Sequence, residues 1–363
     1  MPPKPEIGVL HRQAAARGDV IAMAGGLPAR ELLPRGALER ALREAGTREA
    51  LQYGWPEGAD RLRAWVAERL RARGFAIEPD AVIVTAGAQQ ALSLAAAHLR
   101  PGARIAVGAE TYPAALSAFE AAGVRAVACA PRVDAHYLIV GASNPHGVDR
   151  VSARRAELLG GGSVLLADEA YAELRFDGAT PPPLAAAAPD RVWHVGTVSK
   201  VLAPGLRVGW LVPPRQARKS VLASKEAADL QTGSLAQAVL LRLLGELDYD
   251  ALVARARRFY AARAEVLAHE LRARLPELSF VEPEGGFSLW VESDEPGDDV
   301  ELLEAAVAGG VSFDPGSMFR PDRKASPIAF RLSFSACDPA ALAAGTRRLA
   351  RVLARWRRRA KGD

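Results

Sequence analysis

Short apolar runs that end at loops alternate with Ala- and Arg-rich helical stretches between residues 81 and 212 of this 363-residue chain. Alternation of strands and helices predicts a mostly parallel sheet that is covered by helices on both faces. The strand-like runs lie at 81–85, 104–107, 124–129, 137–141, 163–168, 191–196 and 207–212. The sequence therefore predicts an α/β fold with a mostly parallel, seven-stranded sheet between helices.

The pattern changes after residue 213. A long helical region runs to about residue 274, and alternating strand-like segments with two interleaved helices follow it. This arrangement predicts a second, smaller α+β domain, and we expect the N-terminal segment to join it. We place the large domain at 45–255 and the small domain at 1–44 and 256–363.

The composition argues against several other classes of protein. Hydrophobic residues make up 49% and charged residues 25% of the chain, which is typical of a globular protein. Residues 1–19 lack the apolar core of a signal peptide, and glutamines interrupt the apolar run at 81–99, so we expect no membrane span. Cys129 and Cys337 form no metal-binding pattern. We therefore expect a reduced, cytoplasmic protein without a bound metal.

The net charge of +5 and the pI of about 9.4 raise the question of nucleic-acid binding. The basic residues, however, are spread through helices that also carry Glu and Ala. Their densest cluster, at 347–363, has apolar residues at helical spacing, which indicates an amphipathic last helix with a solvated basic face. We expect no nucleic-acid partner.

A lone lysine, Lys200, stands between a strand-like run and a Pro-Gly turn. The chain has six lysines among its 47 basic residues, so lysine is not its default surface cation. The ordinary explanation is a solvated loop lysine. Polar residues at the ends of neighbouring runs argue for more: they are Asn144, Asp168, Tyr171, Thr197 and Ser199.

These polar side chains are expected to converge, because the carboxyl ends of parallel strands meet at one edge of a sheet. A carboxylate such as Asp168 after an apolar strand is costly unless it has a cationic partner. A lysine among such groups can serve as an amine nucleophile. The pattern therefore favours a reactive site at Lys200 over a solvated loop.

One chemistry uses all of these groups, that of pyridoxal phosphate. Lys200 can form a Schiff base with its aldehyde, and Asp168 can keep its ring nitrogen protonated. Asn144 and Tyr171 can contact its phenolic oxygen. The phosphate requires backbone amides, hydroxyls and an arginine, and the candidates are Gly87, Ala88 and Gln89 at a strand-to-helix turn, with Thr197, Ser199 and Arg207. Tyr112 is placed to stack on the ring.

The order and spacing of these residues resemble the fold-type-I pyridoxal-phosphate enzymes, specifically class I/II aminotransferases of the 2-aminoadipate and kynurenine type. The motifs that carry the resemblance are "SKVLAPGLRVGW", "ADEAY" and "SNPHG", with support from "GGFSLW" and "VSFDPGSMF". The resemblance covers nearly the whole chain. It implies the fold-type-I PLP-transferase fold, pyridoxal 5'-phosphate as cofactor, and amino-group transfer between an amino acid and a 2-oxo acid by a ping-pong Schiff-base mechanism.

The resemblance also implies roles for individual residues. It assigns the Schiff base to Lys200, the ring nitrogen to Asp168, the phenolic oxygen to Asn144 and Tyr171, ring stacking to Tyr112, and the phosphate to Arg207. Tyr53 in "LQYGWPEG" is implied to reach the phosphate of a neighbouring subunit, which implies a homodimer with shared sites. Arg331 in "FRLSFS" is implied to hold the substrate α-carboxylate, with Gly26 near the bound substrate.

The chain departs from the family pattern in three places, which leaves its substrate preference open. His146 stands where the family usually has Thr, Ala88 stands where a hydroxyl residue is common, and the stretch between Cys129 and Asn144 is short. We interpret His146 as a solvated loop residue. Trp55, beside Tyr53, is a candidate for the wall of the substrate pocket.

Two alternative functions remain open at this point. The first is a pyridoxal-phosphate-dependent lyase, decarboxylase or cyclase, because the same Schiff base permits those reactions. The second is a ligand-sensing domain of the kind that regulators fuse to a DNA-binding winged helix. We disfavour the second, since the chain begins almost directly at the "AGGLP" segment.

Overall fold

The computed structural model describes residues 6–361 except 47–49, 129, 131 and 325–326. Its main feature is a seven-stranded sheet, here called the large sheet, with the order β2-β8-β7-β6-β5-β3-β4. Strand β8 runs antiparallel to its neighbours β7 and β2, and the other pairings are parallel. The strands are β2 (Ile83–Thr85), β3 (Arg104–Val107), β4 (Arg125–Ala128), β5 (Ala135–Ile139), β6 (Val164–Asp168), β7 (Val192–Thr197) and β8 (Gly209–Val212).

The predicted runs correspond to these strands, with shifted ends. The run at 207–212 begins as a strand only at Gly209, because Arg207 has a left-handed φ of 53° that an extended strand does not accommodate. Residue 129, the end of the run at 124–129, lies outside the described residues. Asp168 ends β6 and Thr197 ends β7, so both lie at the carboxyl edge of the large sheet.

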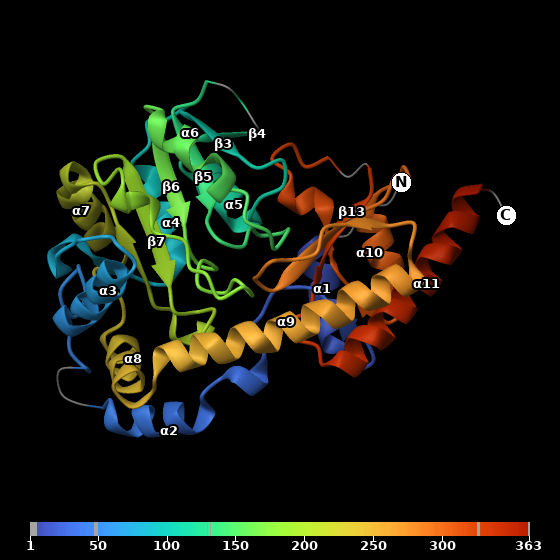
Figure 1. The fold of residues 1–363 in the computed structure, drawn as a ribbon, viewed down its shortest axis with the longest axis horizontal. Coiled ribbons are helices and arrows are strands. Elements are labelled where there is room, and N and C mark those ends of the chain that lie inside the picture. Colours follow the sequence, from blue (N-terminus) through green and yellow to red (C-terminus); the bar gives the residue numbers. More distant parts are fainter. Residues whose placement is uncertain (1–5, 47–49, 129, 131, 325–326, 362–363) are drawn as a thin grey trace.

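Helices cover both faces of the large sheet (Figure 1). Leu165 and Leu166 show why both faces must be covered: these neighbours on β6 point in opposite directions and are buried in two different cores. One core includes residues of α4, α5 and α7, and the other includes residues of α3, α6, α8 and α9. These helices are α3 (Asp60–Ala72), α4 (Ala88–Ala97), α5 (Pro113–Ala121), α6 (Arg155–Gly160), α7 (Arg218–Asp229), α8 (Ser234–Glu246) and α9 (Tyr249–Arg274).

A second, antiparallel sheet has the order β12-β13-β10-β9 and is here called the small sheet. Its strands are β9 (Ser279–Phe280), β10 (Ser288–Glu292), β12 (Asp314–Pro315) and β13 (Ala329–Ser333). The beginning of the N-terminal segment contacts the C-terminal part of the chain: β1 (Ile21–Ala22) pairs with β11 (Val311–Ser312), and α1 (Ile7–Ala16) contacts α10 (Asp299–Ala308).

Helix α9 connects the two parts of the molecule. It starts beside α2 (Arg35–Glu44) and α8 and runs to α11 (Pro339–Lys361), against which it packs (Figure 1). This 26-residue helix passes through residue 255 without interruption, so no break in the structure marks that boundary. The domain boundaries at 45 and 255 stay a prediction.

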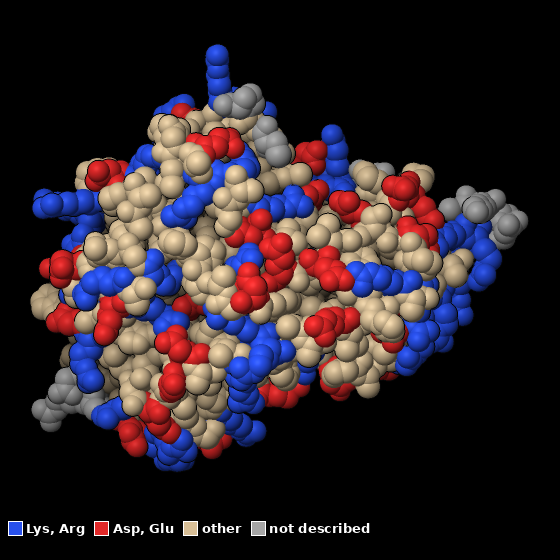
Figure 2. Space-filling view, in the orientation of Figure 1, with Lys and Arg blue, Asp and Glu red and all other residues tan. Residues whose placement is uncertain are grey.

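Charged side chains of both signs are mixed over the face in Figure 2, with Lys and Arg concentrated along the end of α11. That helix is amphipathic, as expected. Leu349, Val352 and Leu353 are buried, whereas Arg351 and Arg355 are exposed. Within the part of the chain that the structure describes, no helix is long and apolar enough to cross a membrane.

Candidate active site

A pocket lies at the carboxyl edge of the large sheet. It is lined by Ala88, Gln89, Tyr112, Ile139, Asn144, Asp168, Ala170, Tyr171, Thr197, Ser199, Lys200 and Arg207. All of these except Ile139 and Ala170 are residues that the sequence analysis singled out. Segments far apart in the sequence thus meet where the parallel strands end.

Asp168 is the buried acid of this pocket, with 4% of its surface exposed. Its Oδ2 accepts a 2.7 Å hydrogen bond from the Tyr137 hydroxyl, and its Oδ1 accepts a 3.0 Å bond from the Ala170 amide. Burial raises the pKa of Asp168, although both hydrogen bonds and the charge of Lys200 act to lower it. A cation in contact with Asp168 would therefore help to hold it ionised.

The Lys200 amine faces two aromatic rings. Its Nζ lies 5.1 Å from the centroid of the Tyr171 ring and 5.6 Å from that of Phe287. The Tyr171 and Phe287 rings pack edge to face, with centroids 5.2 Å apart. Phe287 precedes β10 of the small sheet, so the lysine lies where the two parts of the molecule meet.

The turn between β2 and α4 forms one wall of the pocket. Gly87 has a φ of +79°, a conformation that favours glycine, and a Cβ there would lie 2.7 Å from Nη2 of Arg207 and push this guanidinium aside. Nη2 of Arg207 donates to the carbonyl oxygen of Ala86 at 3.3 Å. The first amides of α4, at Ala88 and Gln89, have no intrahelical partner, which favours an anion at this end of the helix.

Two hydroxyls and a phenol also line the pocket. The oxygens of Thr197 and Ser199 lie 2.8 Å apart. Tyr112 directly precedes α5, and burial, together with the charge of Asp168, raises its pKa to about 12. A hydroxyl with this pKa stays neutral and can donate a hydrogen bond at physiological pH.

Arg331 reaches the pocket through Asn144. Its Nη1 donates a 2.7 Å hydrogen bond to Oδ1 of Asn144, and its Nε and Nη2 both donate to Oδ2 of Asp314, at 3.0 and 2.7 Å. Gly26 lies against the guanidinium: a Cβ there would be 3.5 Å from Nη1. Arg331 and Gly26 therefore lie together, beside Asn144.

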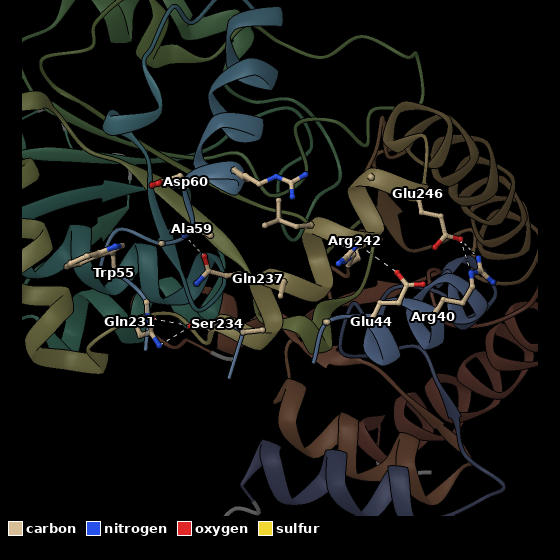
Figure 3. A pocket seen from close by; sticks show the side chains of 18 residues that line it. Arg40, Glu44, Trp55, Ala59, Asp60, Gln231, Ser234, Gln237, Arg242 and Glu246 are labelled. Atoms are coloured by element: carbon tan, nitrogen blue, oxygen red, sulfur yellow. Dashed lines mark hydrogen bonds and ion pairs between the residues drawn. The ribbon is translucent and has the colours of Figure 1, made fainter. Parts of the chain in front are cut away.

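Tyr53 and Trp55 lie outside this pocket. They are 76% and 73% exposed. Trp55 lines a wider hollow of about 980 Å³, beside Gln231 and Ser234. The far side of this hollow carries the ion pairs Arg40–Glu246 and Arg242–Glu44 (Figure 3). Within one chain, Trp55 thus does not line the Lys200 pocket, for whose wall it was a candidate.

His146 is buried, so its interpretation as a solvated loop residue is wrong. Its Nε2 lies 3.3 Å from Oε2 of Glu110, and its ring packs against Trp290 at a centroid distance of 5.5 Å. These neighbours come from the loop after β3 and from the small sheet, and such long-range packing is invisible in the local sequence.

Sequence reasoning missed three polar residues that surround the pocket residues. Tyr137 was treated only as part of a strand, and Glu169, next to Asp168, was not discussed. Asp314 sits in the apolar segment "VSFDPG". The argument used for Asp168, that an acid among apolar residues needs a cationic partner, would also have found Asp314.

The buried Glu169 is held behind the pocket by Arg73 and His194. It pairs with Arg73 at 2.5 Å and with Nδ1 of His194 at 3.3 Å. Burial alone would raise its pKa, but His194 and Arg73 lower it to about 2. Among the described residues, no group of three or more His, Cys, Asp or Glu side chains could hold a metal ion.

Comparison with known proteins places this geometry in context. The sequence pattern described as "Aminotransferase class I and II" matches residues 27–349. A 2-aminoadipate transaminase of Thermus thermophilus is 34% identical, over 93% of this chain and 91% of its own length.

Solved structures agree with the sequence match. The chain resembles the α-aminoadipate aminotransferase of Thermus thermophilus complexed with N-(5'-phosphopyridoxyl)-L-leucine, with a TM-score of 0.85, 31% identity and coverage of 95% and 94% of the two chains. It also resembles a Pyrococcus horikoshii kynurenine aminotransferase, with a TM-score of 0.89, 29% identity and coverage of 97% and 94%. These similarities support amino-group transfer and give no support to the lyase, decarboxylase or cyclase alternative.

Proposed function

This chain belongs to the aminotransferase class I and II family and is a pyridoxal-phosphate-dependent aminotransferase of fold type I, and we propose that the Lys200 pocket is its active site. The observation that carries the proposal is the convergence of Lys200, the buried Asp168 and the Asn144–Arg331 pair at one edge of the large sheet.

The donor set of the pocket fits pyridoxal phosphate. Asp168 is a buried carboxylate whose ionised form needs a cation, and a protonated pyridine nitrogen is such a group. The turn at Gly87, whose positive φ favours glycine, brings amides and Arg207 together, which suits a phosphate. When bound, the cofactor supplies an aldehyde for amines and a ring that accepts electrons from the substrate.

We assign roles to the residues of this chain accordingly. Lys200 would hold the aldehyde end of the cofactor, and once the substrate amine takes its place there, the freed Nζ would remove the proton from the substrate Cα as general base. Asp168 holds a proton on the ring nitrogen, while Asn144 and Tyr171 contact the phenolic oxygen and Tyr112 stacks on the ring. The phosphate is held by Gly87, Ala88, Gln89, Thr197, Ser199 and Arg207.

The substrate is an amino acid in one half-reaction and a 2-oxo acid in the other. Arg331 holds its α-carboxylate, beside Gly26, because a guanidinium is suited to planar recognition of carboxylates. The test is a panel of donors that includes 2-aminoadipate, leucine and kynurenine, each mixed with the holoenzyme without acceptor. A donor must convert the cofactor to its amine form, and 2-oxoglutarate or pyruvate must restore it. Failure of every amino acid would contradict the assignment.

We further propose a homodimer in which Tyr53 reaches the partner's phosphate site. The exposed apolar side chains Leu51, Tyr53 and Trp55 lie beside the exposed Leu230 and Leu235, and such patches mark interfaces. Ser234 donates a 3.0 Å hydrogen bond to the carbonyl oxygen of Gln52, which joins the two segments into one surface.

Mixing two inactive variants tests this arrangement. A dimer of one Lys200→Ala chain and one Tyr53→Ala chain has one site with both defects and one intact site. Random pairing should therefore restore about a quarter of the wild-type activity. Sites built from one chain alone would give no recovery on mixing, and a monomer in sedimentation would contradict the proposal directly.

A further inference from the structure

Asp314 is a buried carboxylate in direct contact with the arginine that we assign to the substrate. It ends the segment that precedes the Pro-Gly of residues 315–316 and is 2% exposed. Besides the two bonds from Arg331, its Oδ2 accepts a 3.0 Å hydrogen bond from the Gly25 amide, and its Oδ1 lies 3.6 Å from Nε2 of His11. Asp314 is therefore fixed on several sides and cannot swing away from Arg331.

In its ion pair with Asp314, Arg331 keeps free N–H groups, but its positive charge is balanced by the carboxylate. A guanidinium has five N–H groups. Asp314 accepts from Nε and Nη2, and Asn144 accepts from Nη1, so two N–H groups remain, one on each Nη. The missing Cβ of Gly26 leaves room beside these nitrogens. A substrate carboxylate can still bind in a planar manner, but it approaches an ion pair and not a lone cation.

We propose that Asp314 determines how strongly this site prefers a carboxylate, an inference that rests on the role proposed above for Arg331. The negative charge of Asp314 repels a bound carboxylate across the guanidinium, and in a buried site this repulsion is large. Asp314 thus weakens the binding of substrate and product acids alike. The site recognises the carboxylate mainly by hydrogen-bond geometry and discriminates only modestly against a neutral carboxamide.

The experiment compares the fastest donor of the panel with its α-carboxamide in wild type, Asp314→Asn and Asp314→Val. Loss of the carboxylate should lower KM for the amino acid about tenfold. The preference for carboxylate over carboxamide in kcat/KM should rise by a similar factor, with kcat within about twofold of wild type. The Val variant provides the same readout if Asn disturbs the local hydrogen bonds.

The opposite result identifies a purely structural role. If Asp314 only orients Arg331, both variants should raise KM for the amino acid and leave the preference for carboxylate over carboxamide unchanged or lower. This outcome overturns the proposal. An unchanged KM in both variants overturns it as well. Asp299→Asn is the matched control. Asp299 is equally buried in the same part of the molecule but binds Ser317, so its variant should keep KM and the preference of wild type.

Arg331→Leu separates this inference from the proposed function. If Arg331 holds the carboxylate, this variant raises KM for the amino acid and abolishes the preference over the carboxamide. If Arg331→Leu behaves in this way while the Asp314 variants bind no more tightly, the inference about Asp314 fails alone. If Arg331→Leu changes neither quantity, the assignment of the carboxylate site fails and the inference falls with it.

Discussion

The Tyr137 hydroxyl donates a 2.7 Å hydrogen bond to Oδ2 of Asp168, and both side chains are buried. Tyr137 lies on β5 and Asp168 ends the adjacent strand β6, so the bond joins neighbouring strands. This hydrogen bond stabilises the ionised carboxylate against the effect of burial. Tyr137 is therefore expected to set the pH range in which Asp168 stays charged.

Replacing Tyr137 with Phe should shift the pH profile of the enzyme. Without the hydrogen bond the pKa of Asp168 rises further, so activity should be lost at a higher pH as the solution is acidified. A bond to a charged group corresponds to a shift of about one pH unit. The profile of kcat/KM against pH measures it. Tyr249→Phe, which removes a part-buried bond to Glu173 and leaves both hydrogen bonds of Asp168 in place, should leave the acid limb unchanged.

Lys200→Ala should remove transamination. The loss of both the anchoring amine and the general base should lower kcat by at least roughly 10³-fold in a steady-state assay. Lys219→Ala, which removes an exposed lysine on α7, is the control and should keep full activity. A Lys200→Ala protein with wild-type turnover would exclude the assignment of the catalytic lysine.

Asp168→Asn should stabilise the cofactor-free protein while it inactivates the enzyme. The folded-state pKa of Asp168 is raised above its ordinary value of 3.8, so the protonated form stabilises the fold and this stability is lost as the pH rises through the folded pKa. The neutral Asn should thus give a higher Tm at pH 7, with the difference vanishing below pH 3.8.

The activity of Asp168→Asn should fall by more than about 100-fold, because a preorganised charge at the reacting group is lost. Asp190→Asn, at an exposed loop position, should change neither Tm nor activity. An Asp168→Asn protein that unfolds at a lower temperature than wild type at pH 7 would refute the electrostatic explanation.

Glu169→Gln should destabilise the fold in a pH-dependent manner. Its folded pKa of about 2 lies below its ordinary value of 4.5, so its stabilising effect is complete above pH 4.5 and is lost as the pH falls towards 2. Urea unfolding should show a deficit of about 3 kcal/mol at pH 7 that shrinks with acidification. For the exposed Glu265→Gln control we expect no deficit at any pH.

The sequence was informative where local pattern and chain order carry the structure. The strands of the large sheet and the residues at their carboxyl ends follow from periodicity and from the geometry of parallel sheets. The pocket around Lys200 and Asp168 could be assembled in this way, because each of its residues lies within a few positions of a strand end.

Contacts between the two sheets could not be predicted in the same manner. The burial of His146 depends on Glu110 and Trp290, and the position of Asp314 against Arg331 depends on the register of β12 and β13. Trp55 illustrates the same limit, since its place depends on how residues 51–55 lie against α8. Such pairings arise from tertiary packing across long separations, for which the local pattern contains no signal.

Helix α9 restricts how this molecule can flex. At its start, the Tyr249 ring packs against Trp65 at 5.3 Å, and further along the helix lies against α11. It contains neither proline nor glycine, the usual causes of a sharp kink. Because α9 is rigid, any movement of the small sheet towards the bound substrate must hinge at the two ends of this helix. The shorter connections between the two sheets must then change conformation.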